Sequence, residues 1–203
     1  MRKIMFNDAF CLTQAVLSGT KTMTRRLLKV PKTCNGTEVC GFNVLTNSLG
    51  IQCVDLLDFD GHVLDSWKPH YEVGEVMAIA QCYKDLYPNA DFEMVGNGFM
   101  TESAGWNNKM FVRANLMKRH IRITDVKVEQ LQDISDDDIM REGVWQFYDQ
   151  KNLFYVFKNI GYAPVVAFLS AREAFAYLID MVNGEGTWNR NPWVVVYTFE
   201  RID

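Results

Sequence analysis

The densest run of side chains that could do chemistry lies between residues 19 and 26. It reads Gly19-Thr20-Lys21-Thr22-Met23-Thr24-Arg25-Arg26 and holds three hydroxyls and three cations. Backbone amides, Lys, Arg and Thr are the groups that hold phosphate oxygens in proteins. The Gly-x-x-x-x-Gly-Lys spacing of a P-loop is absent. The run therefore indicates a contact with phosphate, and an exposed strand edge decorated with Thr and Arg is the alternative.

A second candidate is Glu142, at the end of a short helix predicted over 136–142. Three Asp residues lie in the first turn of that helix, where the helix dipole favours anions. Glu142 lies at the opposite end, just before Gly143, where an anion is disfavoured. A carboxylate in that position needs a partner or a chemical role. A plain surface Glu is the alternative.

Other catalytic and metal patterns are weak. The three histidines are isolated in the sequence, and no Ser–His–Asp or paired-carboxylate spacing is present. A zinc site from Cys34, Cys40, Cys53 and His62 would have spacings that fit no common zinc pattern. We therefore expect reduced thiols, no metal and no cofactor.

Composition and charge limit the class of protein. The 203 residues are 48% apolar and 23% charged, as in globular domains. No apolar run approaches the roughly 20 residues of a membrane-spanning helix, and no signal peptide is recognisable, so we expect a cytoplasmic protein without a membrane partner. The net charge of −4 hides basic blocks over 1–33 and 109–128 and acidic blocks over 34–108 and 129–149. Basic blocks that meet in the fold would form a face for a polyanion, and mutual neutralisation of the blocks is the alternative.

The elements that must position these residues follow from periodicity and from turn and capping signals. Ser135 and Ser170 each precede an acidic residue by three positions, as N-caps do. The apolar face of the strand over 119–131 shifts at Thr124-Asp125, which predicts a bulge. We expect helices over 8–18, 136–142 and 171–182, and strands over 3–6, 20–30, 75–83, 109–114, 119–131 and 193–199.

These elements predict one α+β domain over 1–203. It has an insertion at about 31–70, with a turn at Asp60-Gly61, and a long loop at about 84–108. A bent, mainly antiparallel sheet plugged by two or three helices is typical of a small mixed β-barrel. Loop tryptophans such as Trp106 either stack on bases or close the end of the barrel.

The run from Gly19 to Arg26 resembles the G-x-K-T-x-T-R-R signature of ASCH domains, in the PUA-like superfamily. The resemblance covers nearly the whole chain and is weakest over 31–70 and 84–105. Later segments are similar to the phage and prophage branch of that family; they are Val73-Gly74-Glu75, Asn108-Lys109-Met110-Phe111-Val112, Ile121-Arg122-Ile123-Thr124-Asp125-Val126, Val128-Glu129-Gln130-Leu131-Gln132-Asp133-Ile134-Ser135, Glu142-Gly143, and Gly186-Thr187-Trp188 with Asn191-Pro192-Trp193-Val194.

This resemblance implies a PUA-like β-barrel with a cleft that binds RNA or a modified nucleoside. One bacterial branch of the family is an amidohydrolase that deacetylates acetylcytidine with a Lys, a Thr and a Glu, which would fall on Lys21, Thr24 and Glu142. A Lys of lowered pKa can act as a base on a Thr hydroxyl, and a carboxylate can orient the Lys. Residues 21 and 24 of a regular strand point to opposite faces, so this triad requires a turn or bulge near Thr22-Met23.

The resemblance and the residues together give three functional hypotheses. The first is a nucleic-acid or modified-nucleoside binding module, directed to RNA. The second is a metal-independent amidohydrolase that acts on an N-acylated nucleoside through Lys21, Thr24 and Glu142. The third is a phage accessory protein that binds another protein through its long loops.

Further site residues are expected around the same cleft. The phosphate contacts would come from Thr22, Arg25, Arg26, Arg113 and Arg122. The cleft would be walled by Trp106, Phe111 and Gln81, and Gln81 takes the place of a cleft carboxylate common in this branch.

Overall fold

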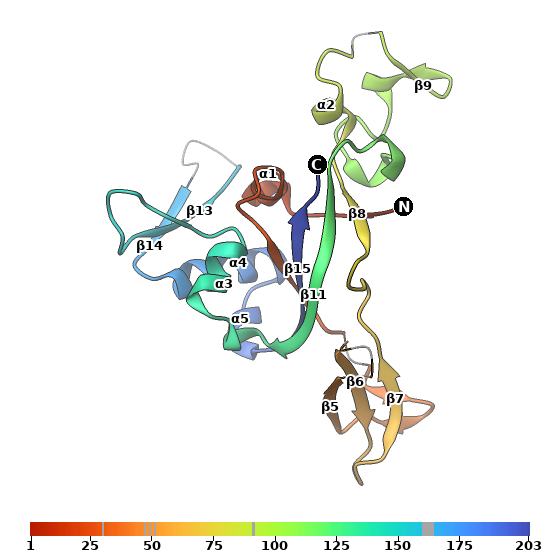
Figure 1. The fold of residues 1–203 in the computed structure, drawn as a ribbon, viewed down its shortest axis with the longest axis vertical. Coiled ribbons are helices and arrows are strands. Elements are labelled where there is room, and N and C mark those ends of the chain that lie inside the picture. Colours follow the sequence, from red (N-terminus) through yellow and green to blue (C-terminus); the bar gives the residue numbers. More distant parts are fainter. Residues whose placement is uncertain (30, 47, 49, 51, 91, 160–164) are drawn as a thin grey trace.

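A central five-stranded sheet organises the chain (Figure 1). The structure is a computed structural model, and it describes residues 1–29, 31–46, 48, 50, 52–90, 92–159 and 165–203. The strand order is β1-β8-β11-β15-β2, in which β1 runs parallel to β8 and the other neighbours are antiparallel. The bounds are β1 Arg2–Ile4, β2 Met23–Leu27, β8 Val76–Ile79, β11 His120–Gln130 and β15 Trp193–Arg201.

The long strand β11 shows why these residues form the sheet. Ile121 and Ile123 are buried on one side of a register shift, and Val126 and Val128 are buried on the other. The shift lies between Ile123 and Asp125, so the predicted bulge is confirmed. An inserted residue re-aims the side chains that follow it, and the apolar face therefore stays toward the core along the whole strand.

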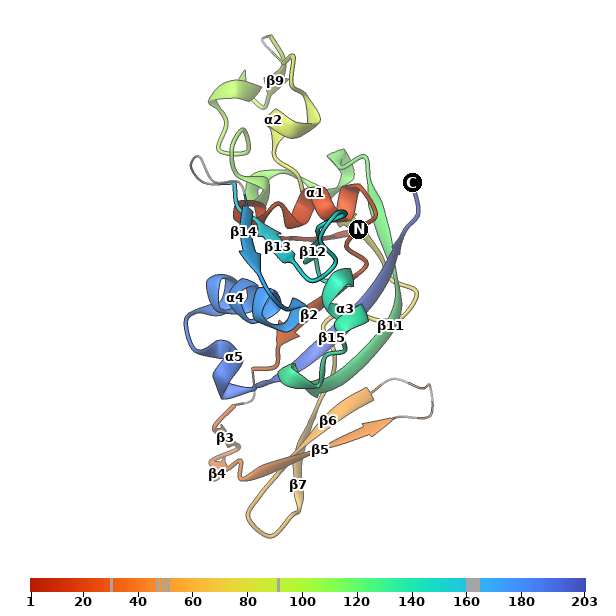
Figure 2. The ribbon, with the colours of Figure 1, turned by 90° about the vertical axis from the view of Figure 1, so that its left-hand side faces the viewer.

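Five α-helices are found among the described residues, where two or three were expected. Their bounds are α1 Leu12–Leu17, α2 Tyr83–Leu86, α3 Asp136–Arg141, α4 Ala171–Asn183 and α5 Thr187–Arg190. Both predicted N-caps are confirmed, because the hydroxyls of Ser135 and Ser170 accept hydrogen bonds from the amides of Asp138 and Glu173, each at 3.2 Å. Helices α3, α4 and α5 lie together on one side of the central sheet (Figure 2). The helix expected over 8–18 is split into a 3-10 turn, Asp8–Phe10, and α1.

The sequence analysis missed a small antiparallel sheet that packs against α4. Its order is β12-β13-β14, with bounds Trp145–Gln146, Phe154–Phe157 and Val165–Phe168. Its strands are only two to four residues long, too short to show a clear alternation of apolar and polar side chains.

The insertion at 31–70 forms a hairpin and a separate three-stranded sheet. The hairpin pairs β3 Thr33–Cys34 with β4 Thr37–Glu38, and the sheet has the order β5-β6-β7, with bounds Gly41–Thr46, Gln52–Leu57 and Val63–Trp67. Strand β6 ties the insertion to the rest of the chain, because Val54 and Leu56 belong to the main buried cluster. The side-chain carbonyl of Gln52 also accepts a hydrogen bond from the amide of Val128 at 2.6 Å.

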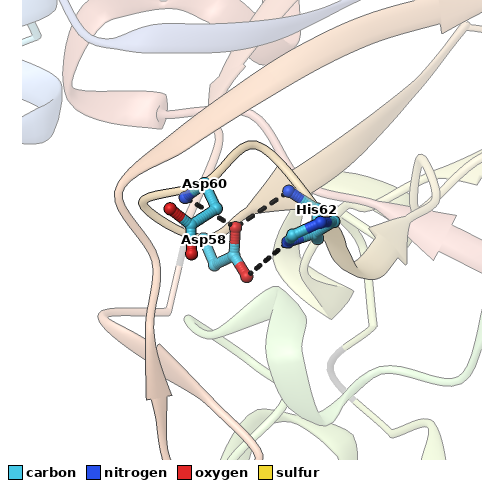
Figure 3. Close-up of side chains that lie close together, drawn as sticks. All are labelled: Asp58, Asp60 and His62. Carbon is cyan, nitrogen blue, oxygen red and sulfur yellow. Dashed lines mark hydrogen bonds and ion pairs between the residues drawn. The ribbon is translucent and has the colours of Figure 1, made fainter.

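The predicted turn at Asp60-Gly61 joins β6 to β7 (Figure 3). Asp58 Oδ1 accepts hydrogen bonds from the amides of Asp60 and His62, at 2.9 and 2.8 Å, and Asp58 Oδ2 lies 3.3 Å from His62 Nδ1. Gly61 has φ +83°, which glycine adopts without a steric penalty. The oxygens of Asp58 are thus engaged in holding the turn.

Two expectations between residues 84 and 114 are corrected. The expected loop at 84–108 contains most of α2 and a two-strand pairing of β9 Met94–Val95 with β10 Gly98–Phe99. The expected strand at 109–114 is instead two 3-10 turns, Lys109–Phe111 and Ala114–Leu116. The Asn108 side chain accepts a hydrogen bond from the amide of Met110 at 3.0 Å and so caps the first turn. A second buried cluster, which includes Tyr83 and Val112, gives this region its own apolar core.

The prediction of an α+β fold is confirmed. A closed barrel is not detected, because β1 and β2 are the outer strands of the central sheet and do not pair with each other in the described part of the chain. None of the described helices is long and apolar enough to cross a lipid bilayer.

The N-cap of α4 gives a first prediction. Ser170→Ala removes the side-chain acceptor for the Glu173 amide, so the free energy of unfolding should fall by about 1 kcal/mol. Ser170→Asp keeps an acceptor and should retain most of the stability. Urea denaturation of the three proteins measures this, and equal stability of the Ala and Asp variants would contradict the capping role.

Candidate functional site

Lys21 and Glu142 meet as a buried ion pair, although 121 residues separate them. Lys21 Nζ donates to Glu142 Oε2 at 2.7 Å and to the Glu142 backbone carbonyl at 2.6 Å. The side chains of Lys21 and Glu142 are 2% and 5% exposed. Glu142 therefore has the cationic partner that its position at a helix end requires.

Local backbone contacts explain how Lys21 reaches this partner. After α1, Gly19 adopts φ +79°, and the Lys21 amide then donates to the Ala15 carbonyl at 2.9 Å. The next amide, of Thr22, donates to the Arg141 carbonyl at the end of α3 at 3.0 Å. This bond joins the segment ahead of β2 to the end of α3, and so brings Lys21 beside Glu142.

The same segment allows Lys21 and Thr24 to line one cavity. Strand β2 begins only at Met23, so Lys21 lies ahead of the regular strand and the opposite-face rule for residues 21 and 24 does not apply. The cavity has a volume of about 250 Å³. Lys21, Thr24 and Glu142 line it together, and hydrogen bonds join Lys21 to Glu142.

Thr24 offers the cavity a hydroxyl that is not already engaged. The residue is 5% exposed, and its backbone lies opposite Tyr197 in the sheet. No side-chain hydrogen bond of Thr24 is found within the described part of the chain, whereas the Thr22 hydroxyl accepts a bond from Arg141 Nε at 3.1 Å. The Thr24 hydroxyl is therefore available to a ligand in this cavity, whereas Thr22 does not line it.

One wall of the cavity is apolar and comes from α4. Sequence analysis missed this wall because its side chains follow the helical spacing of an ordinary core face. Its residues are Phe175, Leu178, Ile179 and Val182, with Asn183 at the end of the helix.

Lys109 also lines the cavity and was missed as a site residue. Its Nζ donates to the Phe6 carbonyl at 2.6 Å, to Asp8 Oδ1 at 2.7 Å and to Thr13 Oγ1 at 2.9 Å. Three acceptors satisfy the ammonium group, so Lys109 forms part of the cavity wall and has no N–H donor left for a ligand. Its signals in the sequence were its place in the basic block over 109–128 and in the family-like segment from Asn108 to Val112.

Arg25 is engaged in an internal ion network. Its side chain is 1% exposed. Its guanidinium lies 2.6 Å from Glu129 Oε1, 3.0 Å from Glu142 Oε1 and 3.4 Å from Asp138 Oδ2. Arg25 thus holds Glu142 from the side opposite Lys21 and has little left for a phosphate. Arg25, which was expected to contact phosphate, is therefore buried inside the protein.

The remaining cations of the expected phosphate site are scattered. Arg26 is exposed and lines the Lys21 cavity, and its Nη2 donates to the Met5 carbonyl at 2.6 Å. Arg122 lies on β11 and pairs with Glu200 at 3.1 Å. Arg113 lines a different cavity. Of these three cations, only Arg26 is placed at the candidate site.

The three expected wall residues do not line the Lys21 cavity. Gln81 lines a separate cavity together with Arg119. Trp106 packs against the second buried cluster. Phe111 is 59% exposed and lines the same cavity as Arg113. In the 3-10 turns that replace the expected strand at 109–114, Lys109 lines the Lys21 cavity, whereas Phe111 lines the separate cavity that also contains Arg113.

Burial controls the charge state of Lys21. Removal of the ammonium group from water lowers the pKa of Lys21 below 10.5. Glu142 acts in the opposite direction, both through its charge and through its hydrogen bond, and the positive charges of Arg26 and Arg25 add to the lowering. Desolvation is the largest of these effects, so Lys21 gives up its proton more readily than a surface lysine.

The buried ion network and the exposed Arg122–Glu200 pair should contribute unequally to stability. Glu142→Gln leaves Lys21 and Arg25 without their shared carboxylate, and the free energy of unfolding should fall by about 3–5 kcal/mol. Glu200→Gln breaks the exposed pair with Arg122 and should cost about 0–1 kcal/mol. Denaturant unfolding compares the two variants, and similar losses would contradict a buried network.

Lys21→Met provides a pH test of the same site. Because the pKa of Lys21 is lowered in the folded state, the unfolded chain binds more protons between that pKa and 10.5. The free energy of unfolding should therefore rise with pH in this window, and Lys21→Met should flatten that rise. Denaturation at several pH values measures the slope, and identical slopes in both proteins would contradict the lowered pKa.

No known protein that resembles this chain gives a function for the site. No family model, no curated protein and no solved structure matches the chain. The resemblance to ASCH domains, which the run from Gly19 to Arg26 carries, therefore stays a prediction.

Proposed function

We propose that the chain is an ASCH-type domain with a PUA-like architecture, whose Lys21 cavity binds a modified nucleoside and hydrolyses its N-acyl amide. The observation that carries this proposal is the buried Lys21–Glu142 ion pair in the same cavity as the unengaged Thr24 hydroxyl. This is the constellation of a base, an orienting carboxylate and a nucleophile.

The size and lining of the cavity favour a neutral ring as ligand. Its volume of about 250 Å³ lies just below the roughly 300–1,000 Å³ of pockets for drug-sized ligands, so a single base fits better than a larger molecule. The apolar wall on α4 suits the face of a base. The two buried cations, Lys21 and Arg25, are already paired with carboxylates, which argues against a pocket built for phosphate.

The proposed reaction is an acyl transfer followed by hydrolysis. Neutral Lys21 Nζ accepts the proton of the Thr24 hydroxyl while Oγ forms a bond to the acyl carbon of the amide. The carbon–nitrogen bond then breaks, and the leaving amine of the base takes a proton from the Lys21 ammonium group. Lys21 then accepts a proton from a water molecule as the water oxygen forms a bond to the acyl carbon. The bond from the acyl carbon to Thr24 Oγ breaks, the Lys21 ammonium group returns the proton to Oγ, and the acyl group leaves as a carboxylic acid.

The surrounding residues support Lys21 as the base. Glu142 fixes the position of Nζ, because its carboxylate and its backbone carbonyl each accept a hydrogen bond from Lys21 Nζ. Arg25 holds the other carboxylate oxygen at 3.0 Å, so the Glu142 side chain is fixed from two sides. Burial supplies the lowered pKa that a lysine base needs.

Turnover of acetylcytidine tests the proposal. Wild-type protein should release cytidine, with or without a chelator, and Thr24→Val should reduce the rate by a factor of about 100 or more. Thr22→Val is the matched control, because the Thr22 hydroxyl bonds Arg141 and lies outside the cavity. Chromatography follows the product. Full activity in Thr24→Val, or equal losses in both variants, would contradict Thr24 as the nucleophile.

A binding module without turnover is the second candidate, and the exposed Arg26 at the cavity favours it. The same assay separates the two functions, because a binding module would hold cytidine derivatives in equilibrium dialysis and release no product from acetylcytidine.

For a protein-binding role, the exposed Phe92 and Met94 are the relevant features. A partner captured by the wild type should then be lost by a Phe92→Ser variant.

A further inference from the structure

A second cavity, of about 490 Å³, opens beside the Lys21 cavity. Met5 and Arg26 line both cavities, so the two adjoin. The floor of the second cavity comes from the central sheet, through Leu27, Val195 and Tyr197. Nothing in the proposed reaction uses this space.

The insertion supplies the aromatic wall of the second cavity. Trp67 ends β7, and His70 and Tyr71 belong to the segment that returns to the central sheet. Trp67 packs against the main buried cluster from one side. Trp67 is half-buried and lines the second cavity, and within the described part of the chain neither an aromatic ring nor a cation stacks on it.

Contacts with the sheet hold the neighbouring rings in place. The rings of Tyr71 and Tyr197 meet edge to face, with centroids 5.0 Å apart. The His70 amide donates to the Tyr197 hydroxyl at 3.0 Å, and the guanidinium of Arg2 lies 5.0 Å from the centre of the Tyr71 ring. The wall is therefore formed before any ligand arrives, which reduces the ordering cost of binding.

Arg26 is the cation available at the boundary between the two cavities. Its side chain is exposed, and the Met5 carbonyl accepts from one of its nitrogens. Lys3, which also lines the second cavity, already donates to the carbonyls of Lys109, Met110 and Val112 at 2.8, 2.7 and 2.6 Å. An anionic group that joins ligands in the two cavities would lie beside Arg26.

We propose that the second cavity is a subsite for the nucleotide next to the one in the Lys21 cavity, with its base against Trp67 and the linking phosphodiester at Arg26. This inference rests on the proposed function, and it makes the preferred ligand a nucleotide chain. An aromatic ring suits a neighbouring base of any identity, because every base has a π-face. The insertion at 31–70 then serves to recognise the nucleotide chain.

Calorimetric binding with unreactive probes tests the subsite. The probes are cytidine, its 5′- and 3′-monophosphates, and the two dinucleotides that join cytidine to adenosine through one phosphate. One of the dinucleotides should bind about tenfold or more tightly than the matching monophosphate, because its second base stacks on Trp67. The monophosphates isolate the contribution of Arg26, which Arg26→Gln should remove.

Two variants and two controls identify the surface responsible. Trp67→Leu keeps apolar bulk without a π-face and should abolish the dinucleotide gain while cytidine binding is unchanged. Met110→Glu places a negative charge at the exposed rim and should weaken the dinucleotide without a change in the fold, since Met110 is 59% exposed. Trp145→Leu and Met94→Glu are matched controls, because neither residue lines the two cavities.

The outcomes separate this inference from the proposed function. If acetylcytidine is hydrolysed and neither dinucleotide binds more tightly than its monophosphate, the subsite is overturned and the proposed function stands. If a dinucleotide binds through Trp67 while cytidine and acetylcytidine neither bind nor react, the subsite stands and the proposed function fails. If none of the probes binds and acetylcytidine is not hydrolysed, both are overturned.

Discussion

The candidate site depends on one buried carboxylate that two cations share. Glu142 stands at the end of α3, and Lys21 and Arg25 hold its two oxygens at 2.7 and 3.0 Å. Removal of these charges from water is costly, so the arrangement persists only while all three side chains keep their partners. The Lys21–Glu142 ion pair links the segment before β2 to α3, the helix that follows β11. The cavity exists because these two parts of the chain meet there.

The same constraint assigns different roles to neighbouring residues in the run from Gly19 to Arg26. Lys21 is buried and has a lowered pKa, so it can exchange a proton with a ligand. Arg25 is equally buried but stays within the ion network and positions Glu142. Arg26 reaches the surface, where its charge is available to a ligand. The cations of one short run therefore divide into a buried lysine with a lowered pKa, a buried arginine that holds Glu142, and an exposed arginine.

Sequence reasoning succeeded where a local signal determined the structure. The caps at Ser135 and Ser170 and the bulge near Thr124 follow from short-range patterns, and Glu142 stood out because its charge opposes the helix dipole. It failed where tertiary contacts decide. The 3-10 turns around Phe111 replace an apolar strand pattern, and the wall on α4 is indistinguishable in sequence from an ordinary core face. The burial of Arg25 depends on Glu129, more than a hundred residues away in the sequence, and no local pattern indicates it.

The charge state of Lys21 is the property on which the proposed reaction depends. A direct measurement is an NMR titration of the protein with 13C-labelled lysine, in which Lys21→Met identifies the Lys21 signal. The account predicts that the Lys21 side chain titrates clearly below 10.5, because desolvation outweighs the attraction of Glu142. A Lys21 that titrates at or above 10.5 would contradict the account, since the ammonium form could not then serve as a base near neutral pH.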